Sequence, residues 1–186
     1  MDEEPRPGRL LVASPRLADP NFARTVVLIL ARDPEGGALG VVLNRPTETV
    51  VADPLPAWAE LAADPAVVFV GGPVGSEGAI GLARAGTAPA GEGWVPVTGR
   101  LGTVDLGSVP DDVDAPVETL RVFAGHAGWG PGQLEAEIDD GAWVVLDAAP
   151  DDVLCATPDR LWRLVLRRQG GKLAWLANVP LDPTTN

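Results

Sequence analysis

The sequence contains few of the side chains from which most catalytic and metal sites are built. Its 186 residues include one histidine, His126, one cysteine, Cys155, and no tyrosine. One histidine and one cysteine are too few for the usual zinc ligand sets, and a single cysteine cannot form an internal disulfide. We therefore assign no metal and no cofactor from the sequence.

Long hydrophobic runs are also absent. The longest apolar run, Val26–Ala31, has six residues, whereas a membrane-spanning helix needs about 20. The N-terminal stretch "MDEEPRPG" is acidic, whereas a secretory signal is basic and then apolar. Together with the single cysteine, this predicts a cytoplasmic protein with no membrane partner.

Positive charge is scarce. The chain has 14 basic and 26 acidic residues, a formal net charge of −12. Because that field repels phosphate backbones, direct DNA binding is disfavoured. Hydrophobic residues make up 46% of the chain, which is enough for a sizeable core. No linker-like stretch divides the sequence, so we expect a single domain over residues 1–186.

Short strands dominate the predicted secondary structure, because Val, Leu and Ile cluster in runs bounded by Gly, Pro or Asp. The stretch "TVVLILARDPEGGALGVVLNRP" predicts a hairpin covered on both faces. The clear strands are Leu10–Ala13, Thr25–Ala31, Leu39–Asn44, Val67–Val70, Leu120–Ala124 and Trp143–Asp147, and weaker ones are Ala79–Ala83, Trp94–Val97 and Leu101–Leu106.

Three helices are predicted: Ala57–Ala63, Gln133–Ile138 and Pro158–Gln169. Thr157 is a candidate N-cap for the last of them. The helices fall irregularly among the strands, so the fold class is α+β with a largely antiparallel or mixed sheet. Among six tryptophans, three with apolar neighbours are expected in the core, Trp58, Trp162 and Trp175.

The stretch "AGHAGWGPGQLEAEI" holds the single histidine in a string of glycines that runs into an acidic helix. Free N–H groups at a helix start attract phosphate, but the acidic side chains that follow would repel it, and the glycine spacing matches no phosphate-binding motif. His126 could act as a general base. None of the candidate nucleophiles Ser14, Ser76, Ser108 and Cys155 lies in a recognised catalytic motif, so we favour a structural histidine.

Two charged patterns remain. Glu135 and Asp139 are four residues apart and could bind Mg²⁺ or Ca²⁺, but a solvated acidic face is the favoured interpretation. Arg160, Arg163 and Arg167 form one stripe on the last predicted helix. These arginines could meet phosphate or an acidic partner, although solvation or pairing with the chain's own carboxylates is favoured.

Seven stretches, in this order, resemble the YqgE/AlgH family of small bacterial proteins over nearly the whole chain. They are "GRLLVASP" at 8–15, "NF" at 21–22 with "TVVLIL", "GALGVVLNRP" at 37–46, "GGPV" at 71–74, "GHAGWGPGQLEAEI" at 125–138, "GAW" at 141–143 and "LW" at 161–162.

The resemblance implies an α+β fold with a branched, partly barrel-like β-sheet surrounded by short helices. It implies no settled activity, although some members carry a transcriptional-regulator label. The family pattern marks glycines and prolines together with Trp129, which we expect to plug a core edge, and with the polar residues Asn44, Gln133 and Glu135.

Two functions remain open. The favoured one is a non-enzymatic regulatory or protein-interaction module, because no catalytic set is found. The alternative is a small-molecule-binding enzyme or hydrolase with a pocket near His126, Asn44 and Glu135. We also expect Trp129 to pack near Asn44–Pro46 and to form a joint partner-binding surface. The candidate surface residues are Asn44, Arg45, Pro46, Gly72, Pro73, His126, Trp129, Gln133 and Glu135.

The isolated protein should show no tight, sequence-specific DNA binding, because its net charge opposes phosphate contacts and the sequence has no helix-turn-helix signal. An electrophoretic mobility-shift assay at physiological salt checks this. Specific binding at nanomolar protein concentration would contradict it.

Overall fold

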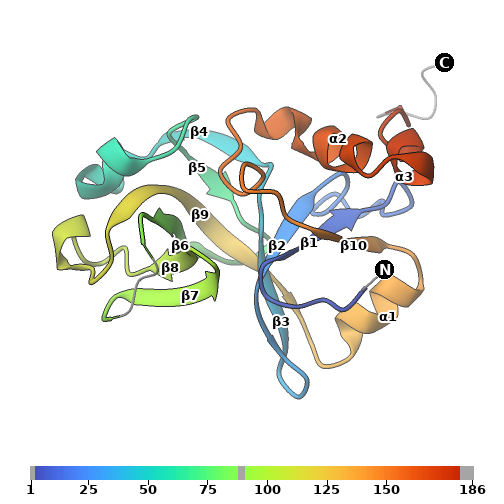
Figure 1. Cartoon of the computed structure of the whole chain (residues 1–186), viewed down its shortest axis with the longest axis horizontal. Helices are drawn as coiled ribbons and strands as arrows, with labels where there is room; N and C mark the ends of the chain where they lie inside the picture. The colour runs from blue at the N-terminus through green and yellow to red at the C-terminus, as the bar shows by residue number, and fades with distance from the viewer. Residues whose placement is uncertain (1–2, 88–90, 181–186) are drawn as a thin grey trace.

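A computed structural model describes residues 3–87 and 91–180, and ten strands in it join into one branched sheet (Figure 1). The strands are β1 Arg9–Ala13, β2 Val26–Asp33, β3 Gly37–Val42, β4 Pro46–Val50, β5 Val67–Val70, β6 Val74–Ala85, β7 Trp94–Thr98, β8 Leu101–Val104, β9 Val117–Trp129 and β10 Trp143–Asp147.

The main path of the sheet runs β10-β1-β2-β3-β9-β6-β8-β7. Neighbours on this path are antiparallel, whereas β5 pairs in parallel with β9 and antiparallel with β4. The sheet curls into a half-barrel with a few short helices outside it. The predicted α+β class with a branched, partly barrel-like sheet is confirmed.

Strand β9 is the branch point. Its first part, Val117–Ala124, pairs with β6, and residues near its middle pair with β5. Its last part, Ala127–Trp129, pairs instead with β3. In Figure 1, β9 crosses the middle of the molecule between these groups of strands. One strand therefore belongs to both halves of the sheet.

Two glycines permit the close backbone approach at this branch. Gly125 has a φ of 72°, and a Cβ placed on it would lie 2.6 Å from the carbonyl oxygen of Gly72. A Cβ on Gly72 would lie 2.1 Å from the backbone carbon of His126. Both distances are far inside van der Waals contact, so only glycine fits at either position.

The β2–β3 hairpin forms as predicted, with antiparallel pairing and one bulge between Ile29 and Ala31. Its two faces enter different hydrophobic clusters, because Leu28 and Val41 belong to one and Val27 and Val42 to another. The expectation that both faces are covered is confirmed. The apolar residues at successive positions are needed because each face has its own core.

The helices are short and lie around the sheet. They are the 3₁₀ helices η1 Pro56–Leu61 and η2 Pro110–Asp112, and the α-helices α1 Gln133–Asp139, α2 Pro158–Arg168 and α3 Gly171–Leu176. Thr157 stands at the N-cap position of α2, as predicted, but its side chain makes no capping hydrogen bond. Within residues 3–87 and 91–180, no helix has the length and apolar character needed to cross a membrane.

Other expectations need correction. Predicted Leu120–Ala124 is the middle of the much longer β9, which continues through the glycines to Trp129. Strand β4 and helix α3 were not predicted. Trp58 and Trp162 are buried as expected, whereas Trp175 on α3 is 81% exposed. Leu173 and Leu176 of α3 are partly buried against the larger core cluster, and the apolar sequence around Trp175 did not reveal that difference.

Gly125→Ala should lower the free energy of unfolding by about 3 kcal/mol, because the new Cβ meets backbone atoms and the residue must hold a left-handed φ. Gly128→Ala is the matched control in the same strand, where a Cβ meets nothing within 4 Å. Urea unfolding of the two variants measures the difference. Equal stability of both would contradict the branch-point argument.

Candidate functional site

Asn44 and Arg45 follow β3 and hold the segment that leads into β2. The Asn44 side chain accepts a hydrogen bond from the Val26 amide at 3.0 Å and donates one to the Arg24 carbonyl at 2.9 Å. Arg45 donates to the carbonyl oxygens of Pro20 and Ala23. Both side chains are thus occupied in fixing backbone, which explains polar residues at the end of this hairpin.

The segment held in this way presents Arg24. Its backbone has a φ of 56°, a left-handed conformation that is uncommon for a residue with a side chain. The guanidinium lies 4.5 Å from the ring centroid of Trp162, at cation–π distance. It also donates to the Pro180 carbonyl, while its Nη1 atom is buried without a hydrogen-bond partner.

Helix α2 provides the rest of this site. Its buried face joins the larger core cluster, and the Trp162 indole donates to the Ala13 carbonyl at 2.8 Å. Its outer face carries the predicted arginine stripe. Helix α2 and the segment that carries Arg24 together line a hollow of about 470 Å³. Its lining residues are Arg24, Asn44, Asp159, Arg160, Trp162, Arg163, Leu164 and Arg167. We call these residues the α2 site.

The α2 site has a net positive charge, because four arginines and one carboxylate, Asp159, line it. Burial, and then the charge of Arg163, lower the pKa of the Arg24 guanidinium. Arg168 on the same helix pairs with the Asp152 carboxylate, and its hydrogen bond raises the Arg168 pKa. Across the described residues no ion pair is recorded for the four arginines of the α2 site. Of the two favoured interpretations of the stripe, solvation describes it better than self-pairing.

His126 lies at the branch point. It pairs with Val74 across β6 and β9, and its ring is near Gly75. Gly72 and the exposed Pro73 are in the connection between β5 and β6, and Gly72 lies against the His126 backbone. His126 also lines a hollow of about 550 Å³, whose other walls include Arg32 and Trp129. The candidate residues Gly72 and His126 therefore lie together.

The acidic helix α1 is fixed by its own carboxylates. Glu135 accepts hydrogen bonds from Arg32 at 2.7 and 3.2 Å, and these lower the Glu135 pKa. Glu137 accepts from the indoles of Trp129 and Trp143 at 2.9 and 2.8 Å. Gln133 donates to the same Glu137 carboxylate. These contacts hold α1 against the sheet.

Trp129 is buried at 5% exposure, as expected of a plug. Its expected packing against Asn44–Pro46 is wrong. Trp129 pairs with Ala38 at the start of β3, which places it up to about 20 Å along the strand from Asn44. Its ring contacts Phe22 and Trp143 instead.

The expected pocket near His126, Asn44 and Glu135 does not form as one hollow. His126 lines a hollow with Arg32, the partner of Glu135. Asn44 lines the α2 site, with both polar atoms of its amide bonded to backbone. Pro46 begins β4, and Arg45 is bonded to the preceding loop. The candidate residues thus divide between two places.

The structure also adds residues that the sequence did not single out. Glu137 could have been found, because it stands four residues after Gln133 on the predicted helix. Arg24 had no sequence signal, since its role depends on a left-handed backbone and on a helix distant in the chain. Among residues 3–87 and 91–180, no group of three or more His, Cys, Asp or Glu side chains is arranged to hold a metal ion.

These features define a class of protein: a branched half-barrel whose polar candidate residues mostly fix backbone, with arginines gathered beside one helix. Residues 10–174 match the AlgH-like family. A UPF0301 protein of Streptomyces coelicolor is 55% identical over 183 residues, covering 96% of this chain and 94% of that protein. One of Mycobacterium tuberculosis is 48% identical and covers 97% and 91%. The chain belongs to the YqgE/AlgH family.

Solved structures agree with this assignment. The crystal structure of a Corynebacterium diphtheriae protein matches with a TM-score of 0.88 and 33% identity, over 96% of this chain and 95% of that one. The solution structure of the AlgH protein from Pseudomonas aeruginosa matches with a TM-score of 0.66 and 29% identity, over 97% and 98%. The branched half-barrel is thus shared by other bacterial proteins.

Glu137→Ala should lower the free energy of unfolding by roughly 2–4 kcal/mol, because two buried indole N–H groups lose their acceptor. Asp139→Ala on the same helix is the matched control, since Asp139 is exposed and its side chain forms no hydrogen bond with another described residue. Thermal and urea unfolding measure both variants. A Glu137 variant as stable as the control would show that the two indole bonds contribute little.

Proposed function

We propose that this protein is a non-enzymatic regulatory module that acts in the cytoplasm by binding an acidic segment of a partner protein at the α2 site. The observation that carries the proposal is the gathering of Arg24, Arg160, Arg163 and Arg167 around one hollow. The net charge of the chain is −12, yet these four arginines form no ion pair with a described carboxylate. Such arginines favour an anionic partner.

The arrangement of the charges favours a protein segment over a small anion. Arg160 and Arg167 are seven residues apart on α2, or about 10 Å along the helix axis. That spacing suits several carboxylates along an extended chain better than one phosphate group. Leu164, 43% exposed, lies between them on the outer face of the helix.

A neighbouring exposed tryptophan supports the same conclusion. Trp175 lies on α3, which packs directly against α2 (Figure 1), and its side chain is 81% exposed. Tryptophan and arginine are the residues most enriched at binding hot spots. An interface that combines arginines with exposed apolar side chains is typical of protein recognition.

The enzyme hypothesis requires His126, Asn44 and Glu135 to line one pocket, and their separation weighs against it. Asn44 is oriented by hydrogen bonds from both ends of its amide to backbone groups, and it lines the α2 site, not the hollow at His126. Glu135 is bonded to Arg32. Neither residue is then available beside His126 for proton transfer, which requires direct hydrogen-bond reach.

Fluorescence anisotropy with a labelled twelve-residue peptide of alternating glutamate and leucine tests the proposal. The peptide should bind, and Arg160→Glu should raise its Kd about tenfold because one attractive charge becomes repulsive. Arg16→Glu is the matched control, since Arg16 is also exposed, carries the same charge and lies outside the α2 site.

Three results would overturn the proposal. The peptide could fail to bind at millimolar concentration, or both variants could weaken it equally. Inorganic phosphate at millimolar concentration could also displace the peptide fully while sodium chloride of the same ionic strength does not, and the site would then recognise phosphate.

A further inference from the structure

A second group of arginines lies where the start of β1 and the end of β10 approach the strands at the other end of the sheet, β6, β8 and β7. Strands β10 and β7 are the two ends of the strand path. The start of β1 approaches the end of β7 so closely that a Cβ on Gly8 would lie 2.6 Å from the Thr98 side chain. A cleft of about 520 Å³ opens beside this contact. We call it the edge cleft.

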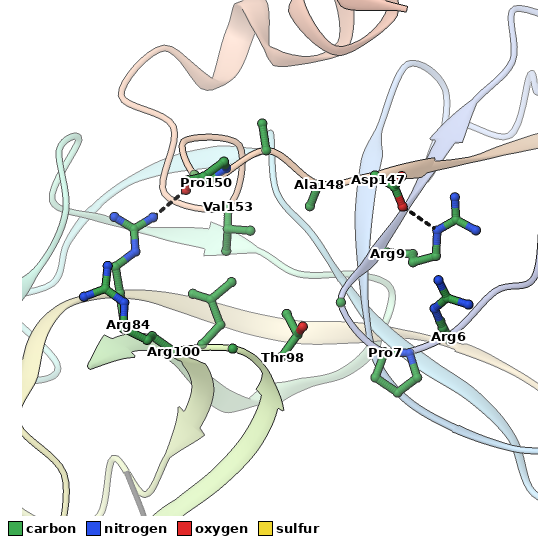
Figure 2. Close-up of a pocket in the computed structure, with 14 residues that line it drawn as sticks. Arg6, Pro7, Arg9, Arg84, Thr98, Arg100, Asp147, Ala148, Pro150 and Val153 are labelled. Carbon is green, nitrogen blue, oxygen red and sulfur yellow. Dashed lines mark hydrogen bonds and ion pairs between the residues drawn. The ribbon is translucent and has the colours of Figure 1, made fainter. Parts of the chain in front are cut away.

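The edge cleft is lined by four arginines and one carboxylate. They are Arg6, Arg9, Arg84, Arg100 and Asp147. Figure 2 shows the arginines as two pairs, with Arg6 and Arg9 on one side and Arg84 and Arg100 on the other. Asp147 lies on the first side, where it pairs with Arg9 at 3.1 Å. The carboxylate therefore offsets charge on one side only.

On the other side, two guanidinium groups lie next to each other. Arg84 is on β6 and Arg100 immediately precedes β8, where the two strands pair. Arg84 donates to the Pro150 carbonyl, and Arg100 donates to the Gly86 carbonyl at 3.2 Å. Both acceptors are neutral, so these bonds position the guanidinium groups, and neither group forms an ion pair with another described residue. Neighbouring like charges of this kind form a site for an anion.

The centre of the cleft is apolar. Val153, Ala148 and Thr98 lie between the two sides in Figure 2, and the Leu101 side chain also lines the cleft. The volume falls in the range of sites for small ligands. A ligand with an anionic group at the Arg84–Arg100 pair would place its remaining atoms against these apolar groups.

From this geometry we infer that the edge cleft binds a small molecule carrying a phosphate group, with the phosphate at Arg84 and Arg100 and an uncharged body along the cleft. A phosphate monoester carries a charge of about −1.5 to −2 at neutral pH. That charge balances two guanidinium groups, whereas one carboxylate would leave a positive charge. The site is separate from the α2 site and shares no lining residue with it.

Isothermal titration calorimetry with three probes tests the inference on the full chain. Hexyl phosphate carries the phosphate and an apolar body, hexanoate replaces the phosphate with a carboxylate, and inorganic phosphate has no body. Hexyl phosphate should bind at least about tenfold more tightly than either of the others. Hexanoate binding as tightly, or no binding of hexyl phosphate at millimolar concentration, would overturn the inference.

Two variants locate the phosphate. Arg84→Gln and Arg100→Gln should each weaken hexyl phosphate binding about tenfold, since each removes one charged donor. Arg16→Gln removes the same charge outside the cleft and should leave binding unchanged. Thermal unfolding of each variant shows whether it is folded, and the comparison of probes on the unmodified protein needs no variant. Equal binding by all three variants would place the phosphate elsewhere.

This result is distinguishable from a failure of the proposed function. Arg160→Glu should leave hexyl phosphate binding unchanged, and Arg100→Gln should leave the acidic peptide unaffected. Loss of both ligands in either variant would mean that one anion surface serves both, which would overturn the assignment of a separate phosphate site.

Discussion

The close contact of two backbones at the branch of β9 is the constraint on which the rest of this structure depends. Each half of the sheet needs β9 as a neighbour, and the strand changes partners near Gly125. The β5–β6 connection must pass directly against it through Gly72. Because side chains are excluded there, the sheet can curl back on itself, and the residue before β1, Gly8, can approach Thr98 at the end of β7. Gly72 and Gly125 are therefore required by the architecture of the sheet.

The same architecture gathers the few positively charged side chains of this acidic protein in two places. Eight of the 14 basic residues line the edge cleft or the α2 site. A molecule with a net charge of −12 repels extended polyanions at long range. At short range the two groups of arginines still create local positive potential, since screening in salt limits the reach of the acidic surface to about 8–10 Å. The net charge of the chain therefore does not determine the local electrostatic potential that a small or flexible anion meets at these two places.

The sequence predicts the strands well because the signal is local: runs of Val, Leu and Ile between turn residues give β1, β2, β3, β5 and β10 to within a few residues. It fails where structure depends on distant partners. Strand β4, with the sequence PTETV and mostly exposed, is a strand only because β5 pairs with it. Trp175 has apolar neighbours in sequence, yet Leu173 and Leu176 are the α3 residues that pack against the core, and the indole is left in solvent.

The candidate site was predictable in part for the same reason. The arginine stripe follows from helical spacing, and α1 from its composition. Arg24 completes the α2 site through a left-handed backbone fixed by Asn44, a contact between residues 20 positions apart. The edge cleft depends on the closure of the whole sheet, so no local pattern could indicate it. Asn44, one of the residues that mark the family, supports the α2 site by holding the Arg24 backbone.

Strand β1 connects the two groups of arginines, with Arg9 at one end lining the edge cleft and Ala13 at the other accepting the Trp162 bond. All five of its residues are buried, and it is hydrogen-bonded to β10 along its length and to β2 at its centre. Burial and pairing on both sides oppose a second arrangement of this strand. Thermodynamic coupling between distant sites requires an element with two states that both ligands bias. Ligands of the two proposed sites, the edge cleft and the α2 site, should therefore bind without cooperativity. Their binding free energies should add, so that each ligand binds equally well whether or not the other is present.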